Sequence, residues 1–169
     1  AAQAEDIEVR ASAFIESLAE RAINALTKED VVREERVERF RALLNENFAV
    51  KTIGRWVLGR YWKRASKDQQ DEYLQLFEDL IVTTYVDRFE AYSNEDIVVT
   101  KAEAGSGRDF LVKSTISRPA GGHPVNVSWR VRVRDEIFKI VDVVVEGVSM
   151  GQTQRSEFAS VIRRNGGTV

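Results

Sequence analysis

The sequence has no cysteine, a single histidine (His123), two prolines and one methionine among its 169 residues. The absence of cysteine excludes disulfide frameworks, thiolate metal sites and cysteine nucleophiles, and one histidine cannot form a histidine-rich metal cluster. His123 lies in a Gly/Pro-rich connection without a second histidine, which is typical of an exposed loop. We therefore expect no catalytic residue, no metal site and no enzyme activity.

Long apolar runs are also missing. Charged residues interrupt every stretch before it reaches the roughly 18 consecutive apolar residues that a membrane-spanning helix needs. The formal net charge of −2 disfavours a nucleic-acid partner, because such binding depends on neutralising phosphates. With 43% apolar and 31% charged residues, the composition predicts one soluble domain, which we place at residues 5–165.

The chain starts with small residues and without an initiator methionine, as Ala1-Ala2-Gln3-Ala4. Such a start is expected for a mature chain left after cleavage at a small-residue signal-peptidase site. The lack of cysteine is compatible with either the cytoplasm or the periplasm, because an oxidising compartment permits disulfides without requiring them.

Residues 5–92 show the three- and four-residue spacing of apolar side chains that predicts amphipathic helices. The first helix is expected from Ile7 to Leu26, the second over residues 33–47 and a short third one over residues 50–58. The face of the first helix opposite its apolar stripe is charged. The apolar stripe is therefore the face that this helix buries.

A fourth helix begins after Ser66, because Ser66 and Gln69 have the spacing of a capping box. Its apolar stripe continues to Tyr92. A helix over residues 67–91 would be roughly 37 Å long at about 1.5 Å per residue. It either forms the backbone of the fold or kinks at the β-branched residues 82–84, where helix propensity is weak.

After residue 92 the apolar period changes from 3.6 to 2, which predicts strands. Four candidates joined by short connections indicate an antiparallel meander, over residues 97–104, 110–118, 125–134 and 137–145. In the third candidate, valines and Trp129 alternate with polar residues, so one face is apolar and must be covered.

The order of these elements defines the predicted fold class, which is α+β. N-terminal helices (residues 5–92) pack on one face of a twisted four-stranded antiparallel sheet, and the sheet and a closing helix over residues 153–164 occupy residues 93–165.

Three arginines, Arg130, Arg132 and Arg134, form a basic stripe on the polar face of the third strand, opposite Trp129. The stripe is either an ordinary solvated face or a contact surface for an anionic partner. Residues 66–104 are predominantly acidic and residues 105–169 predominantly basic, so the two parts could meet different partners.

Asp142 lies among apolar residues of the fourth strand, where a half-buried carboxylate needs a donor. Two interpretations are open. Small α+β cone folds use such an aspartate as a general base in proton-transfer enzymes. Alternatively, Asp142 makes a structural ion pair, for which Arg155 is the candidate, and this is the interpretation that we favour.

Aromatic residues are concentrated in the helical part of the chain. Such a set usually fills a core. Five helices on one small sheet nevertheless carry more apolar surface than a compact layer requires, so a cavity lined by these groups is also compatible with the pattern.

Four segments in order along the chain resemble the MlaC or toluene-tolerance family of periplasmic phospholipid-binding proteins. They are residues 48–62, which run from Phe48 to Trp62, the helical residues 69–85, the sheet residues 110–143, and the closing residues 146–158. The resemblance covers about residues 8–165. One departure is Gly151, in a segment that a bulkier residue often occupies.

The resemblance implies an NTF2-like cone with an interior lipid cavity and a periplasmic carrier that is not an enzyme. Its cargo would be phospholipid, held without any other cofactor. Its implied partners are an outer-membrane lipoprotein complex and an inner-membrane ABC transporter ring protein, with only peripheral, transient membrane contact. A sister group linked to hopanoid metabolism shares the pattern, and a small NTF2-like enzyme that uses Asp142 or an adaptor that uses the basic strand face remain as alternatives.

Motif position and apolar face together select twelve candidate lipid-binding residues. They are Leu44, Phe48, Trp56, Leu58, Phe77, Leu80, Ile81, Tyr85, Val127, Trp129, Val131 and Phe158.

Overall fold

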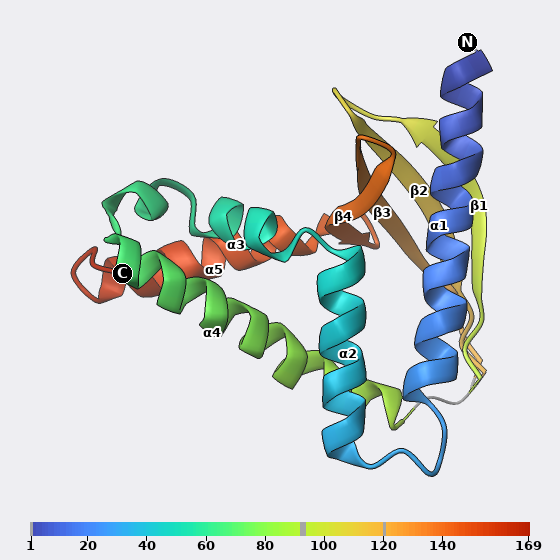
Figure 1. Ribbon diagram of the computed structural model, residues 1–169, viewed down its shortest axis with the longest axis horizontal. Coiled ribbons are helices and arrows are strands. Elements are labelled where there is room, and N and C mark those ends of the chain that lie inside the picture. Colours follow the sequence, from blue (N-terminus) through green and yellow to red (C-terminus); the bar gives the residue numbers. More distant parts are fainter. Residues whose placement is uncertain (1, 92–93, 120) are drawn as a thin grey trace.

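A computed structural model describes residues 2–91, 94–119 and 121–169 of the chain (Figure 1). Its helical part contains α1 (Ala2–Leu26), α2 (Arg33–Asn47), α3 (Val50–Leu58), the 3₁₀ helix η1 (Gly59–Arg64), α4 (Lys67–Tyr85) and the 3₁₀ helix η2 (Val86–Phe89). The strands β1 (Ile97–Ala104), β2 (Asp109–Ile116), β3 (Val125–Arg134), β4 (Ile137–Val145) and β5 (Val148–Ser149) follow, and α5 (Met150–Arg164) closes the chain.

The strands form one antiparallel sheet in the order β1-β2-β3-β4-β5, as a meander with short connections requires. Asp135 and Glu136 join β3 to β4 with φ angles of +50° and +63°, the left-handed conformations of a type I′ hairpin turn. The register between β3 and β4 shifts at Arg130, which pairs with Asp142, whereas the next residue, Val131, pairs with Ile140. Val141 is therefore an extra, bulged residue of β4.

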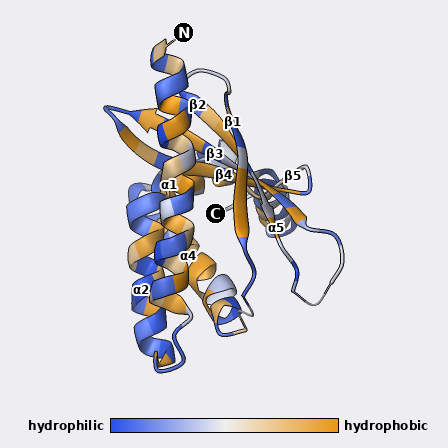
Figure 2. Ribbon diagram, turned by 90° about the vertical axis from the view of Figure 1, so that its right-hand side faces the viewer, coloured by the Kyte–Doolittle hydropathy of each residue, from blue (hydrophilic) through white to orange (hydrophobic). Residues whose placement is uncertain are grey.

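One face of the sheet is covered by α1, which contacts β1 and β2, while α2 contacts β4. Ala11, Ile15 and Leu18 of α1 are buried against strand residues that include Val112, Val131 and Ile140. We call this group the sheet cluster. Figure 2 shows the hydrophobic colouring of the strands against the more hydrophilic turns of α2.

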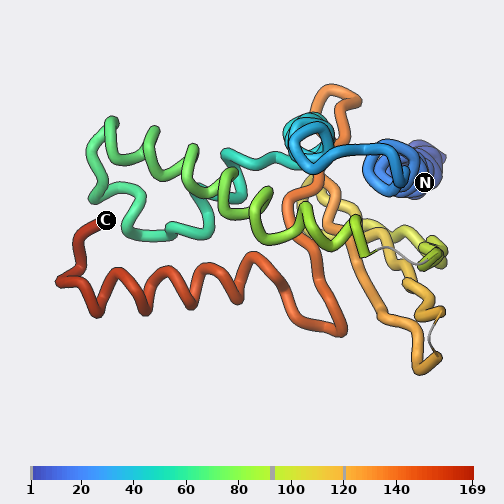
Figure 3. Tube along the Cα trace, turned by 90° about the horizontal axis from the view of Figure 1, so that it is seen from below, coloured from blue at the N-terminus to red at the C-terminus, as the bar shows by residue number. Residues whose placement is uncertain are grey.

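The helices α3, α4 and α5 pack on one another beside the sheet, where α3 contacts both α4 and α5 (Figure 3). Their core, which we call the helical cluster, consists of Leu44, Val50, Val57, Phe77 and Val82, and Tyr73 and Phe158 pack against it. The ring of Phe158 meets those of Tyr73 and Phe77 edge-on, at centroid distances of 6.4 Å in both pairs.

The predicted α+β class is confirmed. Several predicted boundaries are confirmed too, including residues 33–47 for α2 and 50–58 for α3. The capping box of α4 is present, with Gln69 N donating to Ser66 Oγ at 3.2 Å. Several boundaries were wrong. The first helix begins at Ala2 instead of Ile7, β2 covers residues 109–116 instead of 110–118, and α5 begins at Met150 instead of residue 153. The fourth helix ends at Tyr85 and continues as η2, close to residues 82–84, where a kink was the alternative to a longer helix. The sheet also gains β5 as a fifth strand, and Tyr92 lies outside the described residues.

Within residues 2–91, 94–119 and 121–169, no helix combines the length and the apolar character needed to cross a membrane.

Gly54 sets how closely α3 approaches α4. A Cβ atom at this position would lie 2.9 Å from Phe77 Cδ1 and 3.0 Å from Leu74 Cδ2, closer than packed carbon atoms lie. The short separation also lets the Tyr73 hydroxyl donate to the Gly54 carbonyl at 2.6 Å, and burial raises the pKa of Tyr73.

We predict that Gly54→Val lowers the free energy of unfolding by about 1 to 3 kcal/mol, because overpacking forces α3 and α4 apart. Chemical denaturation monitored by circular dichroism measures the change. Lys51→Val, at an exposed position of the same helix, introduces the same side chain without the clash and serves as the control. Equal stabilities of the two variants would contradict the role of Gly54.

Candidate functional site

The twelve residues selected from the sequence differ widely in burial. Five are buried, namely Leu44, Leu58, Phe77, Val127 and Val131. Five are half-buried, namely Phe48, Ile81, Tyr85, Trp129 and Phe158. The remaining two, Trp56 and Leu80, each keep 44% of their surface exposed. The structure distributes the set over several packed clusters.

Phe48 joins the two main clusters, because its side chain packs against both the sheet cluster and the helical cluster. Its backbone is fixed at the edge of the sheet. Phe48 forms a parallel bridge with Ile140 of β4, and the N–H of the next residue, Ala49, donates to the Ile140 carbonyl at 2.9 Å. The connection between α2 and α3 thus attaches the helical cluster to the sheet.

Half-buried apolar side chains lie on both sides of this connection. Trp129 and Val143 pack at the margin of the sheet cluster, and Ile81 and Phe158 at the margin of the helical cluster. We call Phe48 and these four residues the apolar junction. All five are hydrocarbon or aromatic, so the junction presents apolar surface that further hydrocarbon can cover.

The polar edge of Trp129 is satisfied inside the sheet. Its indole N–H donates to Ser114 Oγ at 3.0 Å, and the Ser114 hydroxyl donates to the Val127 carbonyl at 2.7 Å. Because Ser114 is buried, these bonds fix the orientation of the indole ring inside the sheet.

Asp142 does not pair with Arg155, so the predicted ion pair is wrong. Its carboxylate accepts hydrogen bonds from the backbone N–H groups of Val143 at 2.9 Å and Gly151 at 3.0 Å, and from the Ser149 hydroxyl at 2.5 Å. The turn after β4 brings the first residues of α5 back to Asp142, where a carboxylate satisfies free N–H groups. These donors assign Asp142 a structural role at the start of α5.

Arg155 instead lies over the ring of Trp56, with its guanidinium carbon 4.8 Å from the ring centroid. Trp56 and Asp142 also explain why position 151 is a glycine, although a bulkier residue was expected there. A Cβ atom there would lie 3.2 Å from Asp142 Oδ1 and 3.3 Å from Trp56 Cζ3. A side chain at this position would therefore crowd both neighbours.

The basic stripe on β3 is not simply solvated, because two of its arginines hold one buried carboxylate. Asp109, which is 3% exposed, accepts hydrogen bonds from Arg130 Nε at 2.6 Å and Arg132 Nε at 2.8 Å. Burial alone would raise the pKa of Asp109, but the hydrogen bonds from Arg132 and Arg130 outweigh it and lower that pKa. Sequence periodicity did not indicate Asp109, since it begins a strand on the face opposite the core.

Two hollows lie at the surface of the described residues, with volumes of about 420 Å³ and about 260 Å³. Neither is lined by any of the twelve predicted residues. His123 is exposed in its loop, as its position between glycine and proline indicates. In the part of the chain that the structure describes, no three His, Cys, Asp or Glu side chains gather into a group that could hold a metal ion.

The α+β fold, in which the connection at Phe48 attaches the helical layer to the edge of the sheet, defines the structural class of the chain. Comparison with known families gives this class a name. The MlaC protein family matches residues 16–168, and the chain therefore belongs to the MlaC family.

Two curated relatives carry descriptive names. The chain is 27% identical over 116 residues to the intermembrane phospholipid transport system binding protein MlaC of Haemophilus influenzae, covering 67% of this chain and 54% of that protein. It is 26% identical over 108 residues to the toluene tolerance protein ttg2D of Pseudomonas putida, covering 63% and 49%. The chain thus spans about half the length of the curated relatives that it matches.

The fold also occurs in a solved structure. A phospholipid-binding protein from Ralstonia solanacearum, determined in complex with a phospholipid, superposes with a TM-score of 0.79. The match covers 93% of this chain and 89% of that one, at 22% sequence identity. The two proteins therefore share their fold.

The lowered pKa of Asp109 predicts a pH-dependent contribution to stability. The ion pairs contribute fully above the unfolded-state pKa of about 4 and are lost as the pH falls through the lower folded-state pKa. We expect Asp109→Asn to reduce the free energy of unfolding by about 1 to 2 kcal/mol at pH 7. Urea unfolding at several pH values should show this deficit shrinking below about pH 4.

Asp30→Asn, at an exposed position in the α1–α2 connection, is the matched control and should show little deficit at any pH. A deficit of Asp109→Asn that stays constant from pH 7 to acid would contradict the ion-pair explanation.

Proposed function

We propose that the protein is a periplasmic lipid carrier that holds the acyl chains of a phospholipid between sheet and helices. The observation that carries the proposal is the apolar junction, where Phe48 packs against both clusters and further half-buried apolar side chains pack against each of them. Membership of the MlaC family and the names of the relatives, which refer to phospholipid transport and binding, support it.

The energetics of lipid transfer explain why an apolar junction suits this task. A two-chain phospholipid buries some 30 methylene groups in a bilayer, each contributing about 0.8 kcal/mol, so a carrier must replace roughly 20 kcal/mol of apolar shielding. Only extensive hydrocarbon and aromatic surface provides it. A carrier that bound the lipid much more tightly than the bilayer does would not deliver it. Contacts between the junction and the acyl chains that can be released are therefore an advantage.

Acyl chains enter, in this proposal, by replacing protein contacts at the junction. The sheet cluster and the helical cluster each have their own buried core, so they can separate around Phe48 without unfolding. Trp129 and Val143 would line the sheet side of the opened space, and Ile81 and Phe158 the helical side. Leu80 and Tyr85 extend the helical side along α4.

Other members of the twelve have stronger structural roles. Leu58 packs with Tyr61 and Ile162 in a third cluster, away from the junction. Trp56 packs against Arg155 and Gly151. In the proposal these two residues stabilise the helical layer that carries the lining residues.

The carrier receives and delivers lipid at membrane-bound partners. We propose an outer-membrane lipoprotein complex at one end of its path and an inner-membrane ABC transporter ring protein at the other, with only peripheral and transient membrane contact. The alternative of an enzyme that uses Asp142 as a base loses its support, because that carboxylate is occupied by three structural donors.

Native mass spectrometry tests the proposal directly. Protein isolated from its own cells should show an added mass of about one phospholipid, and organic extraction should release that lipid. Lipid analysis of the extract distinguishes a phospholipid from a hopanoid-related cargo. A chain that stays empty and takes up no lipid from vesicles would overturn the proposal.

Leu80→Arg should lower the lipid-bound fraction severalfold, because an acyl chain beside it would then have to bury a charge. The variant should remain folded, since Leu80 is already 44% exposed. Val9→Arg on α1 introduces the same charge at an exposed apolar position and should leave occupancy unchanged. Equal occupancy in the two variants would remove α4 from the binding region.

A further inference from the structure

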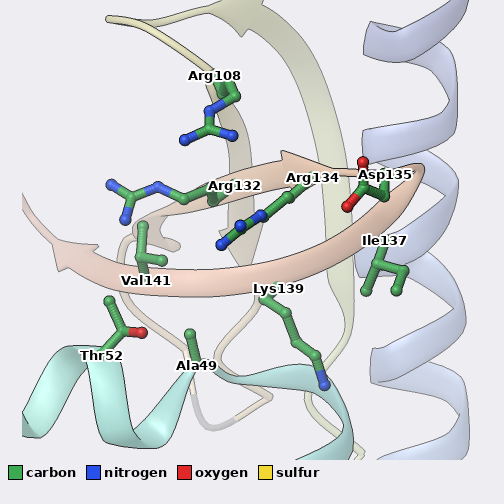
Figure 4. Close-up of a pocket in the computed structure, with 9 residues that line it drawn as sticks. All are labelled: Ala49, Thr52, Arg108, Arg132, Arg134, Asp135, Ile137, Lys139 and Val141. Atoms are coloured by element: carbon green, nitrogen blue, oxygen red, sulfur yellow. The ribbon is translucent and has the colours of Figure 1, made fainter.

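The hollow of about 420 Å³ lies on the outer face of the sheet and is unrelated to the apolar junction. Its volume is sufficient for a small polar ligand. It is lined by Ala49, Thr52, Arg108, Arg132, Arg134, Asp135, Ile137, Lys139 and Val141. Figure 4 shows Arg108, from the turn before β2, and Arg132 and Arg134, from β3, extending over the hollow, with Thr52 and Ala49 on the α3 side across from them.

Positive charge dominates this lining, because four of its residues are cationic and Asp135 is its one carboxylate. Arg108 and Arg134 make no ion pair or side-chain hydrogen bond within residues 2–91, 94–119 and 121–169. Arg132 uses Nε and Nη2 on Asp109, so its Nη1 remains available. The guanidinium groups thus have donors directed at no protein acceptor.

Two of the cationic residues are held in position by the fold. Asp109 is buried below the arginines and fixes the side chain of Arg132. The ammonium group of Lys139 donates to the carbonyls of Asn45 and Glu46 at the end of α2. Like charges are therefore gathered before any ligand arrives, and an anion in the hollow would relieve their repulsion.

The opposite wall adds further donors. Thr52 contributes a hydroxyl group, and Ala49 is the N-cap residue of α3, where no side chain caps the helix. The bulge at Val141 places an apolar side chain between the two walls. A tetrahedral oxyanion has enough acceptor atoms for several guanidinium donors, a hydroxyl and free N–H groups together.

We propose that this hollow binds a phosphate group, supplied either by a lipid headgroup at a membrane surface or by a free phosphate ester. Arginine favours such a ligand because its planar donor pairs match two phosphate oxygens at once. The hollow shares no residue with the apolar junction, so the proposal does not depend on the carrier function.

The test uses the full chain, the double variant Arg108→Ser with Arg134→Ser, and a control with Arg163→Ser and Arg164→Ser. The control removes two exposed arginines at the end of α5, so both proteins lose the same charge. Calorimetry measures binding of glycerol 3-phosphate. Co-sedimentation measures binding to phosphatidylcholine vesicles with and without phosphatidylglycerol.

The first double variant should weaken binding by at least about tenfold, because it removes charge-assisted hydrogen bonds, while the control should match the unchanged protein. If the protein binds glycerol 3-phosphate but not the vesicles, a free phosphate ester is the source of the phosphate group. Binding only to vesicles that contain phosphatidylglycerol identifies a headgroup. Equal losses in both variants, or no binding of either probe by the unchanged protein, would overturn the proposal.

Discussion

Phe48 packs against the sheet cluster and the helical cluster at once, and the backbone at this point is tied to Ile140 of β4. Each cluster has its own set of buried residues. The attachment at the sheet edge nevertheless fixes where the two meet. This contact links elements that are far apart in sequence, because Phe48 follows α2 and Ile140 lies in β4.

The alternation of side chains along β3 gives the sheet two different faces. Val131 and Trp129 face α1 and the junction, whereas Arg130 and Arg132 face outward and hold Asp109. A period of two makes this division unavoidable in a half-covered strand. The two binding functions that we propose, for hydrocarbon and for an anion, therefore lie on opposite sides of one sheet and share no residue.

Local periodicity was sufficient to predict most of the elements, but it missed β5 and the first residues of α5. The ranges of α2, α3 and β3 follow from apolar spacing and from nearby turn residues, which are properties of neighbouring positions. The fourth helix ended earlier than its apolar stripe, because β-branched residues weaken helix propensity there. Contacts between distant segments escaped this reasoning. Asp142 meets Gly151 only after the chain turns back from β4, and Asp109 meets Arg132 only across a strand pair.

The twelve lipid-binding assignments stay predictions, and their differing burial shows what sequence spacing leaves open. Apolar spacing selects residues that face the interior, but it does not distinguish a packed core residue such as Phe77 from a half-buried one such as Trp129. The basic hollow could not be selected at all, because Arg108, Arg132 and Lys139 come from three strand regions whose register decides their proximity.

Photo-crosslinking with a phospholipid that carries a photoreactive group in its acyl chain tests the central claim most directly. The account predicts that peptide mapping by mass spectrometry places crosslinks on α4 near Ile81, on β3 near Trp129 and on α5 near Phe158. Crosslinks confined to the outer face of the sheet, or spread over the surface without preference, would contradict it.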